Sequence, residues 1–385
     1  VGVNDRNKHR FEGMWPLPYG VSYNSYLIDD EMVALVDTVD ICYFEVYLRK
    51  IKQVIGERPI NYLIINHMEP DHSGSIRLIK QHYPGIIIVG NKQTFGMIEG
   101  FYGVTGEQYL VKEGDFLALG HHKLRFYMTP MVHWPETMMT FDETDGVLFS
   151  GDGFGCFGTV DGGFLDTRIN VDKYWGEMVR YYSNIVGKYG SPVQKALQKL
   201  GGLPISAICS THGPVWTENI AKVIGIYDRL SRYDADEGVV IAYGSMYGNT
   251  EQMAEAIAEE LSAQGVKNIV MHNVTKSHPS YIIADIFRYK GLIIGSPTYR
   301  NQIFPEVEAL LSKILLREVK GRYLGYFGSF TWAGAAVKRL AEFAEKSKFE
   351  LVGDPVEMKQ AMKDLTYTQC ENLARAMADR LKKDR

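Results

Sequence analysis

Residues 67–72 read "HMEPDH", and they follow the largely apolar run Ile60–Ile65. Packing a core does not require two histidines and two acidic residues within six positions. Side chains of an extended segment alternate between two faces, so His67 and Glu69 point the same way and can chelate one ion. Asp71 and His72 begin the next turn and can face a second ion. The segment therefore predicts a metal site where a strand ends and a helix begins.

Three further residues with metal-binding side chains follow other predicted strands. His133 lies in "MVHWPET", Asp152 in "LFSGDGFG" and His212 in "CSTHGPV". Each of them is a strand-end residue followed by a turn, which is the context that "HMEPDH" also has. We treat the remaining histidines as surface or structural residues because they lack this context: His9, His82, His121, His122, His272 and His278.

The pattern of the chain changes near residue 235. Up to about residue 233, short apolar strands with glycine-rich turns are mixed with helical segments such as 43–55 and 73–83, which predicts an α/β sandwich. The polar stretch "SRYDADEG" (231–238) reads as a linker. Five strands then alternate with helices expected at 249–264, about 304–318, 333–347 and 366–383, the fifth strand being "FELVGDPVEM". We predict domains 1–235 and 236–385, the second a doubly wound parallel sheet of the flavodoxin-like kind.

The first turn of the second domain predicts a phosphate site. "YGSMYGNTEQM" follows a strand and opens a helix, and such a turn offers backbone N–H groups, the positive end of a helix and hydroxyl groups. The turn is neither a dinucleotide GxGxxG nor a triphosphate loop with Gly-Lys-Ser/Thr. A single terminal monophosphate, as in FMN, fits it better.

Two later loops support a flavin. "SPTYRNQ" (296–302) and "GSFTWAG" (328–334) follow the third and fourth strands, and ligands of open α/β sheets bind at these strand ends. Together the three loops resemble the phosphate and isoalloxazine loops of the flavodoxin family; which loop aromatic stacks on the ring stays open. The expected FMN-binding residues are Ser245, Met246, Tyr247, Gly248, Asn249, Thr250, Pro297, Thr298, Tyr299, Asn301, Ser329, Phe330, Thr331, Trp332, Ala333 and Gly334.

Composition excludes several classes of protein. The net charge of −4 gives no electrostatic case for nucleic acid, and no apolar run is long enough for a membrane span, so we expect a cytoplasmic location. The four cysteines, Cys42, Cys156, Cys209 and Cys370, form no CxxC pair. This excludes a cysteine-ligated iron–sulfur or rubredoxin-like centre within these residues, because such centres need four thiolates.

The metal-binding pattern resembles the metallo-β-lactamase superfamily, in which such strand ends surround two metals. Dizinc hydrolases of that superfamily carry HxHxDH, whereas this chain has Glu69 in place of the middle histidine. Carboxylate and imidazole ligands together suit iron or manganese, and histidine-rich sites favour zinc. Asp152 can bridge two ions roughly 3.5–4 Å apart.

A lactamase-like αββα sandwich followed by a flavodoxin-like domain resembles the flavodiiron protein family over essentially the whole chain. The resemblance implies one iron at His67, Glu69 and His133, another at Asp71, His72 and His212, and Asp152 as a bridge together with an oxo or hydroxo group; His72 is the ligand on which family members differ. It implies FMN-fed reduction of O₂ to water by four electrons or of NO to N₂O, as in oxygen or NO detoxification in an anaerobe. We expect O₂ to be preferred, with NO as the other substrate.

The same resemblance implies partners and further residues. Electrons are expected from an external rubredoxin, a flavoprotein reductase or a reduced deazaflavin, and the chain is expected to form a head-to-tail homodimer, or a tetramer made of two dimers. Tyr182 matches by spacing a position that hydrogen-bonds substrate, and Trp134 is expected to pack against the site. Glu12 stands where some members have histidine, which points to proton supply or to the choice between O₂ and NO.

Two alternatives differ in kind. One is a dizinc hydrolase fused to a flavodoxin module, which zinc content and the absence of reductant-driven O₂ uptake would reveal. The other is an electron carrier with a degenerate lactamase scaffold, in which substitution of His133 would leave gas reduction unchanged.

Overall fold

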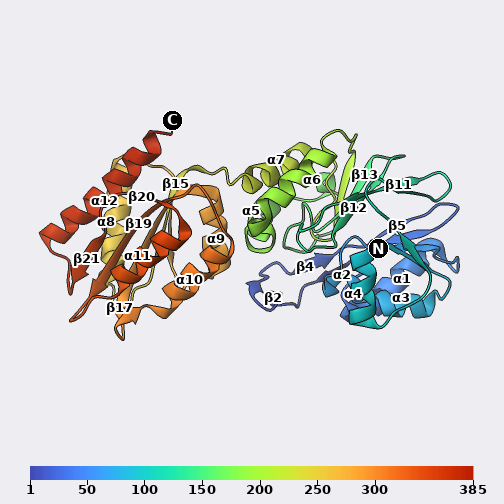
Figure 1. Ribbon diagram of the computed structural model, residues 1–385, viewed down its shortest axis with the longest axis horizontal. Coiled ribbons are helices and arrows are strands. Elements are labelled where there is room, and N and C mark those ends of the chain that lie inside the picture. The colour runs from blue at the N-terminus through green and yellow to red at the C-terminus, as the bar shows by residue number, and fades with distance from the viewer. Residues whose placement is uncertain (385) are drawn as a thin grey trace. The chain divides into compact units, whose positions relative to one another are not determined.

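The structure, a computed structural model, describes residues 1–384 and divides the chain into two compact units. The first unit is Val1–Ser231 and the second begins at Arg232 (Figure 1). Strand β15 of the second unit begins at Asp236, so the expected linker is shorter than the sequence suggested, and residues 236–238 belong to the strand. No helix within residues 1–384 is both long and apolar enough to cross a bilayer.

The first unit is built on two facing sheets. One has the order β5 (Tyr26–Ile28), β6 (Ala34–Val36), β7 (Tyr62–Ile64), β8 (Ile87–Gly90), β9 (Gln108–Leu110), with parallel pairing from β6 onward. The other has the order β10 (Phe116–Ala118), β11 (Lys123–Met128), β12 (Met138–Asp142), β13 (Val147–Gly151), β14 (Ala207–Ser210). Its pairs are antiparallel except β13 with β14. Short strands precede them: β1 (Val3–Asp5), β2 (Arg10–Phe11), β3 (Trp15–Pro16) and β4 (Val21–Tyr23).

Apolar side chains from both sheets form the core between them, including Val36, Val89, Phe126, Phe149 and Cys209. Helices cover the outer faces: α1 (Phe44–Ile55), α2 (Pro70–Ser73), α3 (Ile76–His82) and α4 (Lys92–Tyr102) on one side, α5 (Asp172–Tyr181), α6 (Gly190–Leu200) and α7 (Ile220–Ser231) on the other. This confirms the predicted αββα sandwich. The helix expected at 73–83 is instead two helices, which the chain separates at Gly74 and Ser75.

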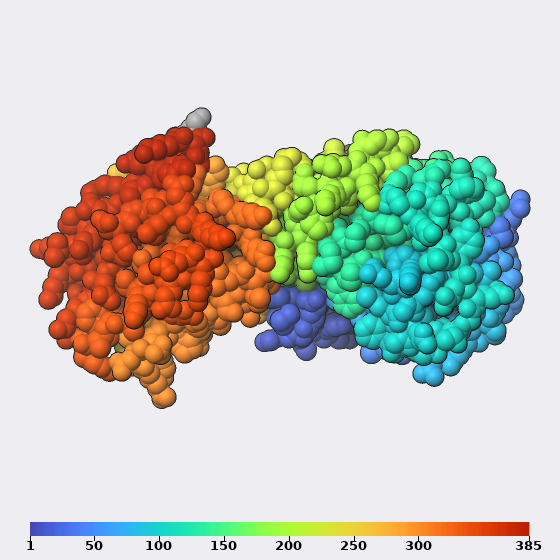
Figure 2. Space-filling view, in the orientation of Figure 1, coloured from blue at the N-terminus to red at the C-terminus, as the bar shows by residue number. Residues whose placement is uncertain are grey.

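The second unit has the strand order β16 (Ile269–Asn273), β15 (Asp236–Tyr243), β17 (Tyr289–Tyr299), β19 (Tyr323–Phe330), β20 (Glu350–Leu351), all parallel. Helix α8 (Asn249–Ala263) and α12 (Asp364–Lys382) share one buried cluster with the sheet; the other helices are α9 (Pro279–Arg288), α10 (Pro305–Leu316) and α11 (Ala336–Ser347). In the space-filling view, the surface of this unit runs from orange to red, and the red atoms of the C-terminal helix α12 lie along one edge of it (Figure 2). The order is that of a flavodoxin-like sheet, which confirms the predicted fold.

Two details of the second unit differ from the sequence-based expectation. The expected fifth strand at 349–358 is interrupted: β20 ends at Leu351, Gly353 has a φ of +71°, and β21 (Val356–Lys359) pairs with β19 afterwards. The expected loop at 296–302 is mostly strand. Strand β17 continues to Tyr299 and turns back through Arg300 and Asn301, both at positive φ, into β18 (Gln302–Ile303). Positive φ at both central residues is the geometry of a tight two-residue hairpin.

Candidate dimetal centre and flavin site

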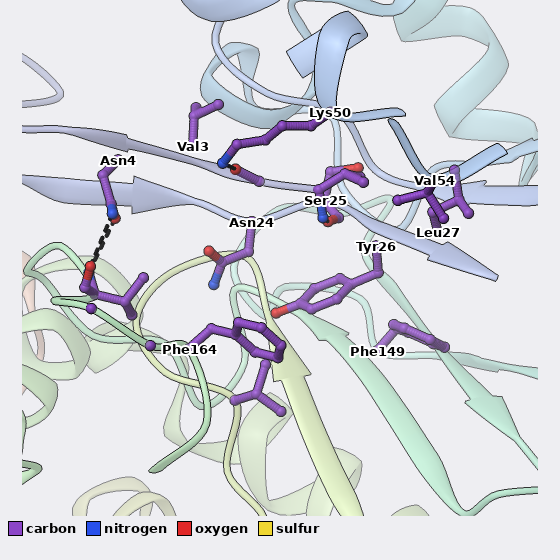
Figure 3. Close-up of a pocket in the computed structure, with 16 residues that line it drawn as sticks. Val3, Asn4, Asn24, Ser25, Tyr26, Leu27, Lys50, Val54, Phe149 and Phe164 are labelled. Carbon is purple, nitrogen blue, oxygen red and sulfur yellow. Dashed lines mark hydrogen bonds between the residues drawn. The ribbon is translucent and has the colours of Figure 1, made fainter. Parts of the chain in front are cut away.

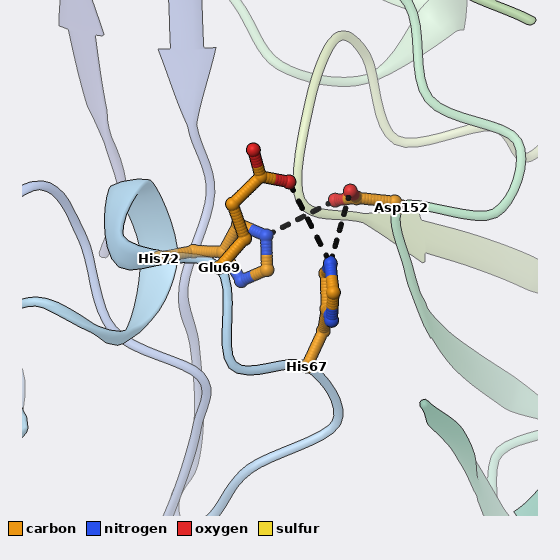
Figure 4. A group of neighbouring side chains, drawn as sticks. All are labelled: His67, Glu69, His72 and Asp152. Carbon is orange, nitrogen blue, oxygen red and sulfur yellow. Dashed lines mark ion pairs between the residues drawn. The ribbon is translucent and has the colours of Figure 1, made fainter. Parts of the chain in front are cut away.

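The segment "HMEPDH" connects β7 to α2 and places four side chains around one point. Strand β7 ends at Ile64, the chain bends at Asn66, and Pro70 then begins α2, at a helix position that favours proline. Figure 4 shows His67, Glu69 and His72 directed at Asp152, although Asp152 comes from a distant part of the chain. The Nε2 atom of His72 lies 3.1 Å from Asp152 Oδ1, and Nε2 of His67 lies 3.6 Å from Asp152 Oδ2.

The three distant residues complete the cluster. Asp152 immediately follows β13, His212 lies two residues after β14, and His133 lies in the loop after β11. His133 Nε2 is 3.1 Å from both Glu69 Oε2 and Asp152 Oδ2. His212 Nε2 is 3.3 Å from Asp71 Oδ2 and 3.5 Å from Asp152 Oδ1. The structure thus brings all seven sequence-predicted ligand residues together.

Asp152 divides these residues into two sets. Its Oδ2 atom faces His67 and His133, which also approach Glu69, while its Oδ1 atom faces His72 and His212, which also approach Asp71. A carboxylate whose oxygens face different ligand sets has the arrangement needed to bridge two ions. Two overlapping groups have ligand atoms close enough to share an ion: His67, Glu69, His72 and Asp152, and Asp71, His72 and His212.

The cluster is buried and its polar atoms are incompletely satisfied. The side chains of His67, His72 and His212 are fully buried, and Asp152 is almost so. Among the described residues, the inward Nε2 atoms of these three histidines and both carboxylate oxygens of Asp71 have no hydrogen-bond partner. Each such atom carries an energetic cost when buried, and a coordinated cation removes that cost. The residues therefore fit a pair of metal ions.

The electrostatics of the cluster also favour cations. Burial alone would raise the pKa of Asp152, but the imidazoles of His72 and His133 hold it well below its usual range. The pKa of Glu69 is likewise lowered, by His133 and His67, against the effect of burial. Burial would lower the pKa of His72, yet Asp71 and Asp152 raise it to about 10. The carboxylates of Glu69 and Asp152 are therefore ionised and attract positive charge, whether protons on imidazole or metal ions.

Hydrogen bonds behind the cluster orient two of the histidines. His67 Nδ1 lies 2.7 Å from Glu136 Oε1, and His212 Nδ1 lies 2.7 Å from the carbonyl oxygen of Ser22. Both contacts leave Nε2 facing inward, as outer hydrogen bonds to metal-binding histidines do. Sequence reasoning did not single out Glu136, although it lies within "HWPET", three residues after His133.

Two neighbouring tyrosines lie at the end of α5, and Tyr182 is the one selected from the sequence. Tyr182 begins the π-helical segment Tyr182–Val186 and its ring packs against Tyr227, with centroids 5.0 Å apart. The neighbouring Tyr181 ends α5, and its ring centroid lies 5.7 Å from that of His212. Burial and then Asp152 raise the pKa of Tyr181 well above its usual value. Adjacent helical residues point about 100° apart, a difference that motif spacing does not resolve.

A cavity of about 500 Å³ opens beside the cluster. Its walls include Phe11, Glu12, Glu69, Asp71, Phe101 and Tyr102. The Glu12 carboxyl accepts a hydrogen bond from Trp15 Nε1 (2.8 Å), and the surrounding protein, followed by Glu69, raises its pKa. Trp134 packs edge-to-face on His67, with centroids 5.2 Å apart at 88°, as expected. The cavity gives a small molecule access to the ligand residues.

A second cavity, of about 580 Å³, is lined by the N-terminal residues 1–4, by residues 24–27 and by the loop at Phe164 (Figure 3). Its polar groups bind one another or backbone: Tyr26 Oη donates to the Ser210 carbonyl (2.6 Å), and Asn24 Nδ2 donates to the same oxygen (3.0 Å). Lys50 Nζ donates to the Gly2 carbonyl (2.6 Å). These bonds brace the segment that carries His212, and the remaining walls are mostly apolar, including Val54, Phe149 and Phe164.

In the second unit, the three predicted flavin loops follow adjacent strands. Tyr243 at the end of β15 is in register with Gly295 of β17, and Pro297 of β17 with Ser329 of β19. The loops after β15 and β19 therefore meet on either side of the end of β17. The chain reverses its direction across the sheet at β15, and ligands of such sheets bind at this point.

The loops are joined to one another and to two helix N-termini. Ser245 Oγ accepts from the Gly248 amide (3.1 Å) just before α8 begins, and Gly248 has a φ of +90° that favours glycine. Thr250 Oγ1 lies 2.8 Å from Ser329 Oγ. Thr298 Oγ1 accepts from the amides of Ala335 and Ala336, at the start of α11. These contacts assemble one site from the three loops.

The aromatic residues of the loops differ in exposure. Tyr247 is 88% exposed and Trp332 is 80% exposed, whereas Tyr299 is 37% exposed and packs edge-on against Phe304. The first two are free to cover a planar ring, and Tyr299 is more fixed. The other predicted contacts on these loops are Met246, Asn249, Asn301, Phe330, Thr331, Ala333 and Gly334.

Known proteins match both units. The family model "ODP family beta lactamase" matches residues 21–213, and the model "Flavodoxin" matches residues 241–373. A curated protein of Vibrio vulnificus, "Anaerobic nitric oxide reductase flavorubredoxin", is 32% identical over 91% of this chain and 72% of its own length. The "Nitric oxide reductase" of Moorella thermoacetica is 31% identical over 99% of this chain and 96% of its own.

Solved structures agree. The rubredoxin oxygen:oxidoreductase of Desulfovibrio gigas superposes with a TM-score of 0.95 at 31% identity, covering 100% of this chain and 96% of that one. The flavodiiron protein of Giardia intestinalis has a TM-score of 0.93 at 26% identity, covering 100% and 95%. The chain belongs to the flavodiiron protein family. Membership confirms the family resemblance read from the sequence, and with it a flavodiiron protein's pairing of an FMN domain with a dimetal domain.

Proposed function

We propose that this flavodiiron protein is an oxidoreductase that reduces O₂ to water, NO to N₂O, or both, at two iron ions supplied with electrons by FMN. One ion takes His67, Glu69 and His133, the other takes Asp71, His72 and His212, and Asp152 bridges them. The observation that supports this most directly is the division of the seven residues by Asp152, whose two oxygens face the two sets. The names of similar proteins, nitric oxide reductases and an oxygen:oxidoreductase, indicate the same chemistry.

Iron is proposed over zinc because of the donor set. Glu69 occupies the position that is histidine in dizinc hydrolases, so three carboxylates join four imidazoles, a mixture that suits iron. The phosphate of FMN is assigned to the start of α8 with Ser245, Asn249 and Thr250, and the ring system to Tyr247, Tyr299 and Trp332. Iron and FMN, when bound, supply the electrons that reduce the gas.

The residues around the metals then have distinct roles. The cavity beside the cluster admits a small gas, and Phe11 and Phe101 in its wall limit water. Glu12 lies at the same cavity, and burial followed by the nearby Glu69 raises its pKa, so its carboxyl is placed to supply a proton. We transfer the role first given to Tyr182 to Tyr181: its buried hydroxyl, which has no hydrogen-bond partner within residues 1–384, is available to bind the substrate.

Four further properties of the protein are predictions. They are the preference for O₂ over NO, the external donor (rubredoxin, a reductase or a reduced deazaflavin), the head-to-tail homodimer or tetramer, and the cytoplasmic location.

Anaerobic stopped-flow mixing of the reduced protein with each gas tests the proposed function. We expect oxidation of the flavin by at least one gas, and loss of this oxidation in His133→Ala with FMN still bound. Bound zinc with no reaction toward either gas would support the dizinc hydrolase instead. Unchanged gas reduction in His133→Ala would support a carrier in which the dimetal site has no role.

A further inference from the structure

Glu136 places a buried negative charge directly behind one metal-binding histidine. Its Oε1 atom accepts from His67 Nδ1 at 2.7 Å and from the amide of Met68 at 2.9 Å. Glu136 and His67 are both fully buried, and Oε2 of Glu136 has no hydrogen-bond partner in the described part of the chain. The salt-bridge partner that the structure gives this carboxylate is the His67 ring. Its charge therefore acts mainly on that imidazole.

The position of Glu136 is fixed by its surroundings. Asn91 Nδ2 donates to the Glu136 carbonyl, and Asn91 itself caps α4 by accepting from the amides of Gln93 and Thr94. Trp134, from the same loop, packs edge-to-face on the His67 ring. The carboxylate and the imidazole are thus held together by the fold, without reliance on the metal.

Within residues 1–384, neither His72 nor His212 of the other ligand set has a carboxylate hydrogen-bonded to its Nδ1 atom, and buried Asp37 acts through space on both His72 and His67. His212 Nδ1 meets the neutral carbonyl of Ser22 at 2.7 Å. His72 Nδ1 is buried and finds no hydrogen-bond partner among residues 1–384. An anionic acceptor makes an imidazole a stronger donor to its metal than a neutral acceptor does, and a stronger donor stabilises the higher oxidation state. Burial strengthens this effect, because charges interact more strongly away from water.

We infer that Glu136 is a positioning residue that makes the two metal positions unequal: through His67 it favours the ferric state of the ion held with Glu69 and His133. This inference rests on the proposed function, since it takes the two ligand sets as given. Each step is the reduction of one ferric ion to ferrous by one electron, which reduced FMN supplies in the protein. With iron bound, the residues on the His212 side would hold the ion that is easier to reduce, and the residues on the His67 side would hold the ion that is harder to reduce.

Redox titration of the iron-loaded protein with dithionite, followed by electron paramagnetic resonance of the half-reduced state, tests the inference. Glu136→Gln keeps an oxygen that can accept from His67 but removes the charge. We expect the preference of one ion for the ferric state to fall at least tenfold, which is a rise of about 59 mV in one of the two potentials. The other potential is expected to stay within error of the wild type.

Asp142→Asn is the matched control. Asp142 is buried and pairs with His122 at 2.8 Å, but it lies at the far end of β12 from the cluster, and His122 is outside both ligand sets. This variant should leave both potentials unchanged. Equal shifts of both potentials in Glu136→Gln, or no shift, overturn the inference. If Glu136→Gln does not fold, Glu136→Asp is used, because its shorter side chain moves the charge away from His67 by one carbon. This variant must raise the same single potential, and unchanged potentials in it refute the inference. Iron and flavin contents are measured in each sample, so a chain without two irons contradicts the proposed function and not this inference.

Discussion

Removal of the metal ions is expected to lower the free energy of unfolding of the first unit, because it leaves buried polar atoms of the cluster without partners. Without ions, four buried side chains have inward atoms that lack hydrogen-bond partners in the described structure: His67, Asp71, His72 and His212. An unsatisfied buried polar group costs about 1–3 kcal/mol, so the four together cost about 4–12 kcal/mol. Ion binding at a thousandfold excess over the dissociation constant returns about 4 kcal/mol for one site.

We take about 4 kcal/mol, the lower end of this range, to calculate the expected shift in melting temperature. A unit of this size shifts by roughly 2–4 °C per kcal/mol, so we expect the metal-free unit to unfold about 8–16 °C below the loaded one. Calorimetry of protein treated anaerobically with a chelator, before and after ferrous iron is returned, measures this difference. Magnesium should not restore the transition, because it prefers oxygen ligands in an octahedral site.

A pair of histidine variants provides the control. His212→Ala should lose most of the iron-dependent shift, whereas His122→Ala, which removes a histidine paired with Asp142 outside the cluster, should retain it. A difference below about 2 °C between loaded and metal-free wild type would refute the reasoning, because the unpartnered atoms would then be satisfied without ions.

Three other predictions concern the scaffold. Gly295→Ala places a Cβ 2.1 Å from the buried ring of Phe327, so it should cost about 1–3 kcal/mol in urea unfolding, whereas Gly176→Ala, in open space on α5, should not destabilise. Burial raises the pKa of Asp37 to about 6, from 3.8. In metal-free protein, the contribution of Asp37 to the free energy of unfolding is therefore favourable below pH 4 and is lost as the pH rises through 6. Across that range the wild type should lose about 3 kcal/mol of stability relative to Asp37→Asn. Equilibrium unfolding at a series of pH values measures this difference. Thr298→Val removes the acceptor for two amides at the start of α11 and should weaken FMN binding severalfold in a fluorescence titration, with unaltered affinity contradicting the proposed assembly of the loops.

The metal-binding residues were predictable from the sequence because their side-chain types and their positions after strands both point to a metal site. His67, His133, Asp152 and His212 each follow a strand, and strand ends at one edge of a sandwich lie close together, so motif spacing was sufficient to collect them. The flavin loops were predictable for the same reason: the strand order places the ends of β15, β17 and β19 side by side.

What the sequence did not reveal depends on side-chain direction and on three-dimensional neighbours. Tyr181 and Tyr182 are equivalent in spacing and differ only in the direction they face from the end of α5. Glu136 is an ordinary acid in the pattern, and its role follows only from the fold, which places it 69 residues away from His67 in sequence but 2.7 Å away in space. The hairpin after Tyr299 and the break in the strand at Gly353 both depend on residues with positive φ. The sequence does not show which residues adopt positive φ, so neither feature was predicted.

Counting the electrons that the fully reduced protein delivers to a gas tests whether the flavin and the dimetal centre reduce that gas together. The loaded protein is reduced anaerobically until the flavin holds two electrons and each iron holds one, and a single portion of gas is then added. We expect the four stored electrons of each chain to be used in full: one O₂ is consumed without hydrogen peroxide, or four NO are consumed with formation of two N₂O. Accumulation of hydrogen peroxide together with failure to consume NO, or flavin that stays reduced in the presence of both gases, would contradict it.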